Sequence, residues 1–422
     1  MATMVHRDLD DGDPLARLLT NDALSLSGDA VVRLGDYELQ SYLGMSRVSG
    51  QPPAITQLQR SSARYFQRPD AEYVEMNPLR TSMAGTKAGA SFRRQNPRHW
   101  RWEAGTTIES PEFETNDLGR LTSSDGLQVF GTAGYQETTP GRWLREYRID
   151  VTETQEWNYG RDEQVSSLQG STRLRWLNYW DTDFFWQYDF RTQDMRLTRG
   201  GPSMEKPRAW RTELEVESSN TDQTRGGINL VYGGTEDGGL TFQARPEFIT
   251  RPAPRWELTL RPSYTRSVDT QQYVQTVPGL NGDSPGYLFG AIDRSTWSAE
   301  IRLSYTFKPD LTLDFYGEPF AASGRYDRIS QLASARSRLL LPVDPSVADP
   351  VDFNFNLRSF RSNLVLRWEW RPGSTLYAVW QQNRERDGVA SERASAADML
   401  RAIVAPGDHI FAVKTSFWVS PG

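Results

Sequence analysis

One polar segment of the sequence contains a basic residue in a setting that could bind an anion. Arg199 lies in the phrase LTRGGP, residues 197–202, and two glycines and a proline follow it. These residues impose a tight and specific backbone path, which would hold the guanidinium group in a fixed place. Arg199 is therefore a candidate for binding an anionic ligand. We prefer the simpler interpretation that the segment folds inward and Arg199 pairs with carboxylates of the interior.

A second polar segment carries oxygen ligands. Glu114, Asn116 and Asp117 occur together in the phrase FETNDLG, and their carboxylate and amide oxygens could bind a cation or the hydroxyl groups of a sugar. A turn stabilised by an Asn or Asp side chain and ending at Gly119 explains the same residues equally well. Both interpretations stay open.

A third group of charges recurs at every second position of predicted strands. Glu300 and Arg302 share one side of a strand, and Arg367 and Glu369 share one side of another. Charges inside a protein must be paired or hydrated. A ladder of opposite charges would stabilise an interior, whereas a stripe of one sign would line an ion-selective pore. The mixture of signs favours pairing, and these four residues are also candidate ligand contacts.

Catalytic and metal chemistry have little support in the sequence. The three histidines, His6, His99 and His409, are far apart and fit no metal-binding spacing, and the chain has no cysteine. We therefore expect no catalytic group, no metal and no cofactor. The net charge of −6 argues against nucleic acid as the main partner.

The elements that would position these residues are strands. In segment 296–307, side chains alternate between an apolar face and a polar face, as expected where a strand separates an apolar phase from water. Its length suits the roughly 9–11 residues with which a tilted strand crosses a bilayer. The apolar face consists of Trp297, Ala299, Ile301, Leu303, Tyr305 and Phe307. A soluble sheet with one wet face also alternates, but the lengths and the aromatic residues near strand ends favour a membrane.

Short turns and long loops follow one another along the chain. Short turns such as Gly35-Asp36 keep the apolar positions of the two flanking strands on one face. Outer-membrane barrels have short turns on the periplasmic rim and long loops on the other. The predicted long loops are 47–84, 109–125, 192–207, 267–293, 323–357 and 386–407, and a short helix is expected within 391–403.

The pattern predicts an all-β fold: a transmembrane, antiparallel, up-and-down β-barrel of about 16–20 strands. We predict 17 strands, near 23–34, 37–47, 85–95, 98–108, 126–137, 142–155, 168–177, 180–191, 208–218, 226–235, 239–250, 255–266, 294–307, 311–322, 358–370, 374–385 and 408–419. The runner-up fold, a β-propeller, lacks the repeated motifs that it requires.

The odd strand count leads to a further expectation about the N-terminal part. Bacterial single-chain barrels usually have even strand numbers. We expect residues 1–22 to be the stub of an upstream strand plus a loop, residues 23–422 to form the barrel, and the chain to begin inside a larger protein. Strand 408–419 should then form no long ladder with 23–34. It should keep a ragged edge or pair antiparallel with residues near 1–6.

Six phrases of the sequence are similar to those of a known family: HRDLDDGDPLARLL (6–19), YFQRPDAEY (65–73), FETNDLGRL (113–121), EWNYGRD (156–162), LTRGGP (197–202) and SFRSNLVLRWEWRPGSTLYAVWQ (359–381). They resemble the bacterial DUF5916 proteins, often described as carbohydrate-binding family 9 domain-containing proteins. The resemblance implies a signal peptide and a β-sandwich domain, followed by a barrel-like region, and this chain is similar to that last region. It carries over no catalytic residues.

Three functions remain possible from the sequence. The first is a channel, transport or ligand-binding barrel of the bacterial outer membrane, with a saccharide or other small nutrient as ligand by analogy with the family's usual upstream domain. The second is an outer-membrane hydrolase, and the third is a structural barrel whose loops dock a partner. In each case we expect a monomer embedded in the lipid bilayer.

Overall fold

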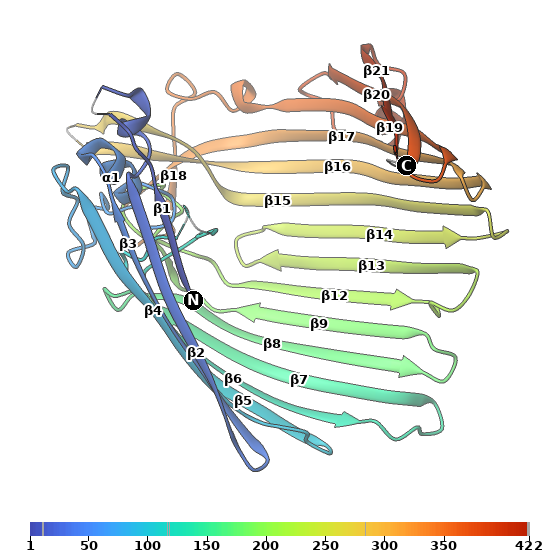
Figure 1. Cartoon of the computed structure of the whole chain (residues 1–422). Helices are drawn as coiled ribbons and strands as arrows, with labels where there is room; N and C mark the ends of the chain where they lie inside the picture. Colours follow the sequence, from blue (N-terminus) through green and yellow to red (C-terminus); the bar gives the residue numbers. More distant parts are fainter. Residues whose placement is uncertain (11, 116, 118, 283, 420–422) are drawn as a thin grey trace.

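The computed structural model describes residues 1–10, 12–115, 117, 119–282 and 284–419. In this part of the chain, a single curved antiparallel sheet of 19 strands forms almost the whole molecule (Figure 1). Its strands are β1 (Ala2–His6), β2 (Asp22–Leu34), β3 (Tyr37–Ser49), β4 (Ser82–Arg94), β5 (Trp100–Glu109), β6 (Gly126–Glu137), β7 (Leu144–Trp157), β8 (Glu163–Trp176), β9 (Asp181–Asp189), β12 (Ala209–Glu217), β13 (Thr224–Thr235), β14 (Leu240–Thr250), β15 (Trp256–Asn281), β16 (Ser284–Lys308), β17 (Leu311–Leu332), β18 (Leu340–Pro342), β19 (Phe355–Arg371), β20 (Ser374–Asp387) and β21 (Gly407–Ser416).

The remaining elements are small and lie in the connections. The hairpin β10 (Gln193–Asp194) and β11 (Met204–Glu205) forms a separate two-stranded sheet. The helices are α1 (Pro52–Gln59), α2 (Ala396–Ala402) and the 3-10 helices η1 (Pro14–Arg17) and η2 (Pro350–Phe353). None of the described helices is long and apolar enough to cross a membrane.

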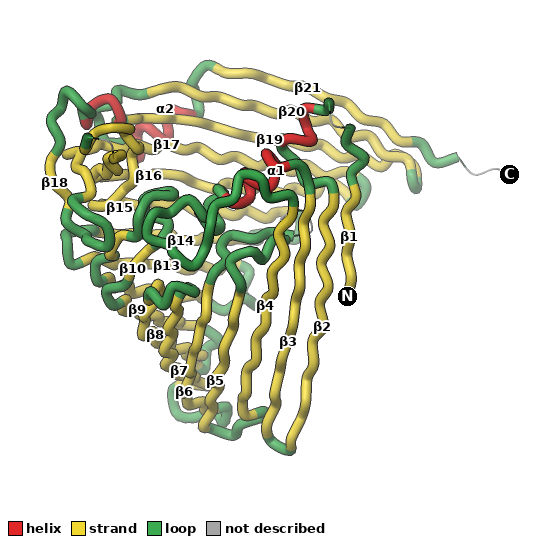
Figure 2. The backbone as a smooth tube through the Cα atoms, turned by 90° about the vertical axis from the view of Figure 1, so that its left-hand side faces the viewer, coloured by secondary structure: helices red, strands yellow, loops and turns green. Residues whose placement is uncertain are grey.

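The large sheet is curved but open. Apart from β18, which in the described part of the chain pairs only with β17, the strands of this sheet form its wall, and each pairs with the wall strands before and after it in the chain. Among the described residues, β1 pairs only with β2, and β21 pairs only with β20. The two edge strands lie on either side of the opening of a trough (Figure 2). The expectation that 408–419 forms no ladder with 23–34 is therefore confirmed. Closure into a barrel, which the sequence pattern predicted, is not present in this sheet.

All 17 strands predicted from the alternation occur, and the helix expected in 391–403 is α2. The prediction of a long loop at 267–293 was wrong, because β15 and β16 continue through this range as a long hairpin. Bulges interrupt its register between Asp269 and Gln272 and again between Tyr273 and Gln275, so the regular alternation that marks the other strands is lost. The loop predicted at 323–357 is likewise shortened, since β17 runs to Leu332.

The wall has its more apolar side chains on the outward, convex face. On β5, Trp100, Trp102 and Ile108 are exposed, while the polar side chains between them are partly buried on the concave face. The pairing of neighbouring strands places apolar residues opposite apolar residues on this face. For example, Leu214 of β12 pairs with Phe184 of β9. A soluble sheet with one wet face normally covers its apolar face, so the exposed apolar side distinguishes this wall from such a sheet.

Compact apolar cores occur only where the long loops pack on the wall, within the part of the chain that the structure describes. One core joins Ile55 and Phe66 to Ala23, Val48 and Met83 of the first strands. A second contains Met204, Phe289 and Leu332, and a third contains Leu288, Ile329 and Ala348. The loop end is therefore the part of the molecule that resembles a globular domain.

Candidate ligand site beneath the loop cap

Five connections gather over one end of the trough, and we call them the cap. Figure 2 looks onto this end, where the loops lie in front of the strand ends. The cap consists of residues 50–81, 110–125, 158–162, 190–208 and 333–354. Contacts between these loops fix the geometry of the site beneath them.

A buried ion pair joins the first two loops of the cap. The guanidinium of Arg64 lies 2.8 Å from a carboxylate oxygen of Glu114, and both side chains are almost fully buried. Arg64 also donates to the carbonyl oxygens of Leu58 at 3.0 Å and Phe113 at 2.8 Å. Glu114 is thus part of the internal structure of the cap.

A second buried cluster joins the first loop to the start of β6 and to the loop after β7. The Arg68 guanidinium lies 3.3 Å from Asp125, and the Tyr73 hydroxyl donates to the same carboxylate. The backbone N–H of Tyr159 donates to the other oxygen of Asp125 at 2.9 Å. Burial is the main cause that raises the pKa of Tyr73, so its hydroxyl keeps its proton.

The LTRGGP segment crosses the cap with Arg199 and Gly200 in left-handed conformations, at φ of 52° and 101°. The Arg199 guanidinium lies 4.6 Å from the centre of the Tyr273 ring. Arg199 thus packs on an aromatic ring, whereas the sequence analysis preferred a carboxylate partner. The N–H of Ser203 donates to Asp70 at 2.8 Å and ties this segment to the first loop.

The FETNDLG segment anchors the N-terminal part of the chain. Asp117 accepts from Arg7 at 2.7 Å and also accepts from the Thr20 hydroxyl. The N–H of Gly119 donates to the Thr115 carbonyl at 2.6 Å and closes a turn at the expected place. Asn116 lies outside the described residues.

Two acidic residues bind arginines of the cap loops 190–208 and 333–354. Glu236, in the turn after β13, accepts from Arg191 at 2.6 Å and from Arg338 at 3.0 Å. These contacts and the N–H of Arg208 lower the pKa of Glu236 to about 2, with the Arg191 hydrogen bond as the largest cause. Arg336 similarly binds Asp162 at 3.0 Å. Ion pairs therefore hold loop 333–354 to the turn after β13 and to the loop after β7.

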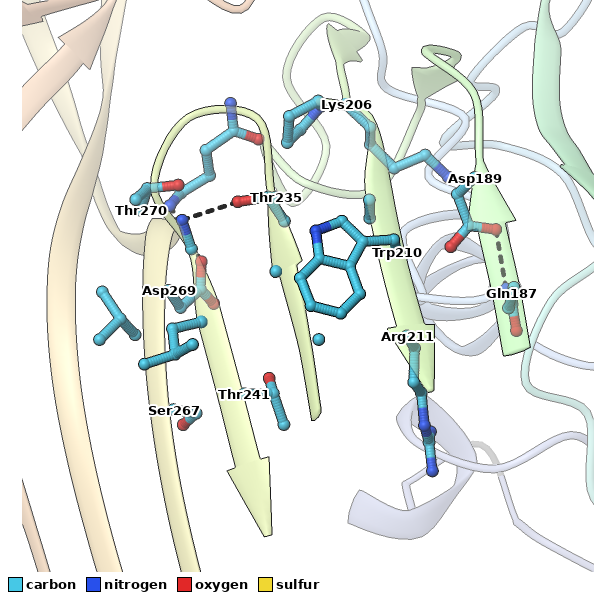
Figure 3. Close-up of a pocket in the computed structure, with 18 of the residues that line it drawn as sticks. Gln187, Asp189, Lys206, Trp210, Arg211, Thr235, Thr241, Ser267, Asp269 and Thr270 are labelled. Carbon is cyan, nitrogen blue, oxygen red and sulfur yellow. Dashed lines mark hydrogen bonds between the residues drawn. The ribbon is translucent and has the colours of Figure 1, made fainter. Parts of the chain in front are cut away.

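A cavity of about 710 Å³ lies beneath the cap, against the concave face of β9 and β12 to β15 (Figure 3). Its volume is in the range of small-molecule sites. Its polar lining includes Gln187, Asp189, Lys206, Arg211, Thr241, Gln243, Ser267, Asp269 and Arg294. The sequence pattern placed several of these residues on polar strand faces but did not reveal that they surround one space.

The charges of this cavity already have protein partners. Lys206 donates to the Gln164 carbonyl at 2.8 Å, and Asp189 accepts from Gln187 at 2.7 Å. Arg294 lies 3.7 Å from Asp269. The lining therefore offers hydroxyl and amide groups together with charged groups of both signs that already have hydrogen-bond or ion-pair partners, which suits a polar ligand of low net charge better than a strongly charged one.

Charge pairs continue along the concave wall toward the short-turn rim. Glu300 accepts from both Arg261 and Arg302 at 2.8 Å, and Arg302 also lies 5.3 Å from the Tyr316 ring centre. Arg367 and Glu369 are paired at 2.9 Å. The pairing expected from the mixed signs is present, but these four candidate residues, Arg199, Glu114 and Asp117 do not meet in one site.

No group of three or more His, Cys, Asp or Glu residues in the described part of the chain is arranged to hold a metal ion.

A family comparison matches residues 47–420 to the family described as "Domain of unknown function (DUF5916)". The chain belongs to the DUF5916 family. No curated protein matches the sequence.

Solved structures similar to this DUF5916 chain include siderophore receptors and an iron transporter, at low sequence identity. The ferric enterobactin receptor PfeA of Pseudomonas aeruginosa is 9% identical, with a TM-score of 0.42 over 93% of this chain and 70% of the receptor. The siderophore receptor PirA of Acinetobacter baumannii is 8% identical, with a TM-score of 0.40 over 93% of this chain and 70% of the receptor. The FrpB iron transporter of Neisseria meningitidis is 9% identical, with a TM-score of 0.42 over 89% of this chain and 62% of the transporter. At these TM-scores the similarity says nothing about the ligand.

Four of the six phrases that resemble DUF5916 proteins contribute to the cap: 65–73, 113–121, 156–162 and 197–202. Residues 65–73 supply Arg68 and Tyr73, which bind Asp125 beside 113–121. Residues 156–162 contribute Tyr159 and Asp162, and residues 197–202 lie next to Ser203, which binds Asp70. Phrases separated by more than a hundred residues therefore build one structure, which the sequence alone did not indicate.

Proposed function

We propose that this DUF5916 chain forms most of the wall of a monomeric β-barrel in a bacterial outer membrane, and that the cavity beneath its cap binds a small polar ligand for transport. The observation that supports the membrane location is the exposed apolar, aromatic face of the wall opposite a concave face of paired charges. Lipid would cover the first face, and water or ligand would contact the second.

The lining of the cavity supports a ligand of low net charge that is rich in hydroxyl or amide groups. Charged ligands would have to displace existing pairs, such as that of Arg294 with Asp269, at a cost in free energy. Thr241, Gln243 and Ser267 offer hydrogen bonds without this cost. A saccharide fits this chemistry, but the saccharide link itself stays a prediction.

A docking role for the cap is the second candidate. The buried pair of Arg64 with Glu114 and the Arg68–Asp125 contact give the cap a fixed outer surface, as a binding platform for another protein would require. The hydrolase considered from the sequence stays a prediction.

Cysteine labelling tests the assignment of the two faces, because the natural chain contains no cysteine. We expect Glu215→Cys, on the concave face of β12, to react with a charged, membrane-impermeant maleimide after reconstitution into lipid vesicles. Leu214→Cys, on the outward face, should be protected by lipid although Leu214 is 37% exposed in the protein itself. Equal labelling of both positions in vesicles would refute the membrane location.

Filling the cavity tests the ligand role. We expect Thr241→Trp, inside the cavity, to slow the passage of arabinose in an osmotic-swelling assay with vesicles that contain the protein. Phe242→Trp, the neighbouring change on the outward face, should leave the swelling rate unchanged, since Phe242 pairs with Tyr232 and Arg266 away from the cavity. Absence of swelling with the unmodified chain would contradict transport of small sugars and favour the docking role.

A further inference from the structure

The α2 segment lies against the outward face of the wall and not over the cavity. Met399 of α2 and Ala394 before it form a buried cluster with Ala321, and Trp297 packs against this cluster. The Ser295 hydroxyl donates to the carbonyl of Ala394 at 3.0 Å. Because Ala321 and Trp297 are paired neighbours on the outward face, α2 covers the outside of β16 and β17 at the end where the cap lies.

Three arginines beside this segment converge on one carboxylate. Asp293 of β16 accepts from Arg266 of β15 at 3.3 Å and from Arg393 of the α2 segment. The Arg325 guanidinium, on β17, lies 3.7 Å from the same carboxylate. The three arginine side chains are 36%, 40% and 37% exposed for Arg266, Arg325 and Arg393, so their charges also face the surroundings.

A second cluster lies next to the first. Asp398 of α2 pairs with Arg358 of β19 at 2.9 Å and with Arg401 at 3.4 Å. Together the two clusters contain five guanidinium groups and two carboxylates, which leaves an excess of three positive charges. We call these seven residues the outer arginine cluster: Arg266, Asp293, Arg325, Arg358, Arg393, Asp398 and Arg401.

The position of the outer arginine cluster along the strands corresponds to a membrane interface. On β15, Arg266 follows Tyr264 on the outward face, and Tyr264 packs on Trp297 with ring centres 4.3 Å apart. Aromatic residues of this kind mark the boundary between hydrocarbon and headgroups. Leu400 and Val404, at the end of α2, are 59% and 79% exposed and would contact the same boundary.

We propose that the outer arginine cluster binds the phosphate groups of an anionic lipid in the leaflet on the cap side. This proposal rests on the membrane location proposed above. Arginine suits this role because its planar guanidinium binds phosphate oxygens in pairs and stays charged. One carboxylate shared by three arginines holds their side chains together without neutralising them, and the lipid chains would lie along the apolar wall below Tyr264 and Trp297.

The test measures binding of lipid A, a lipid with phosphate headgroups, to the full chain in dodecylmaltoside micelles by native mass spectrometry. We expect Arg325→Gln/Arg393→Gln to weaken lipid A binding roughly 30-fold, at roughly fivefold for each arginine near an anionic surface. The matched control, Arg173→Gln/Arg245→Gln, removes two partly exposed arginines of the concave face and should bind lipid A as the natural chain does.

Other outcomes would overturn the proposal. Equal lipid A affinity in the cluster variant and the natural chain would show that these arginines do not bind lipid phosphate. Inorganic phosphate that competes for the site as strongly as lipid A would assign it to a free anion. Circular dichroism identical to that of the natural chain verifies that the variant is folded. Failure of the Leu214→Cys protection would instead contradict the membrane location, so the two failures can be distinguished.

Discussion

Replacing Arg64 by alanine is expected to lower the local stability of the cap by about 3–5 kcal/mol, because it leaves the buried Glu114 carboxylate without its cation. The same change removes the donors to the Leu58 and Phe113 carbonyls. Hydrogen exchange of amides in 51–80 and 110–125, converted to free energies of opening, would measure the effect. Amides of β12 to β14 should exchange as before, since the wall does not depend on this pair.

Arg60 provides the matched control. It lies four residues away and is exposed, so Arg60→Ala should change the opening free energy by no more than about 0.5 kcal/mol. The double variant Arg64→Met/Glu114→Leu should recover much of the loss, because apolar residues of similar size often replace a buried ion pair without cost. A small effect of Arg64→Ala alone would mean that water reaches this pair.

Leu303→Arg is expected to destabilise the membrane-inserted chain by roughly 2–4 kcal/mol, the cost of a charged side chain on the lipid face near the midplane. Leu303 lies near the middle of the outward stretch from Trp297 to Phe307 and pairs with Leu258 and Phe315 on the same face. A refolding titration in lipid vesicles, followed by tryptophan fluorescence, would measure the loss.

Ser304→Arg tests the same position on the other face. The Ser304 hydroxyl donates to Asp314 at 2.7 Å on the concave side, where a new arginine would meet water and a carboxylate. This variant should lose much less stability than Leu303→Arg. Similar losses for the two variants would show that the two faces do not differ in their surroundings.

The wall could be predicted from the sequence because each strand carries its own evidence. Alternation in 296–307 and the pairing of the residues that flank turns such as Gly35-Asp36 on one face are local properties, and both were correct. The hairpin across 267–293 was missed because bulges change which face a residue occupies. In addition, Phe289 packs under the cap while Leu288 packs in the neighbouring core, so both faces there are covered.

The candidate site was much less predictable. Arg64 and Glu114 are separated by 50 positions, and Arg336 and Asp162 by 174, so no local pattern relates either pair. Arg199 was correctly placed in a constrained loop, but the ring of Tyr273 as its partner depends on how the missed hairpin folds. The cavity could not be predicted for a similar reason, because it forms only when β9 and β15, which are far apart in the sequence, lie on one curved sheet.

The two free edges of the sheet have a consequence for how the chain behaves in hydrocarbon. An antiparallel edge leaves alternate backbone N–H and C=O groups without partners, and each such group costs several kcal/mol in the absence of water. Within the described residues, the outer side of β21 presents this row over Gly407–Ser416, and the outer side of β1 presents a shorter one. In a membrane, these two edges would therefore favour pairing with a further strand, which would supply partners for their backbone groups.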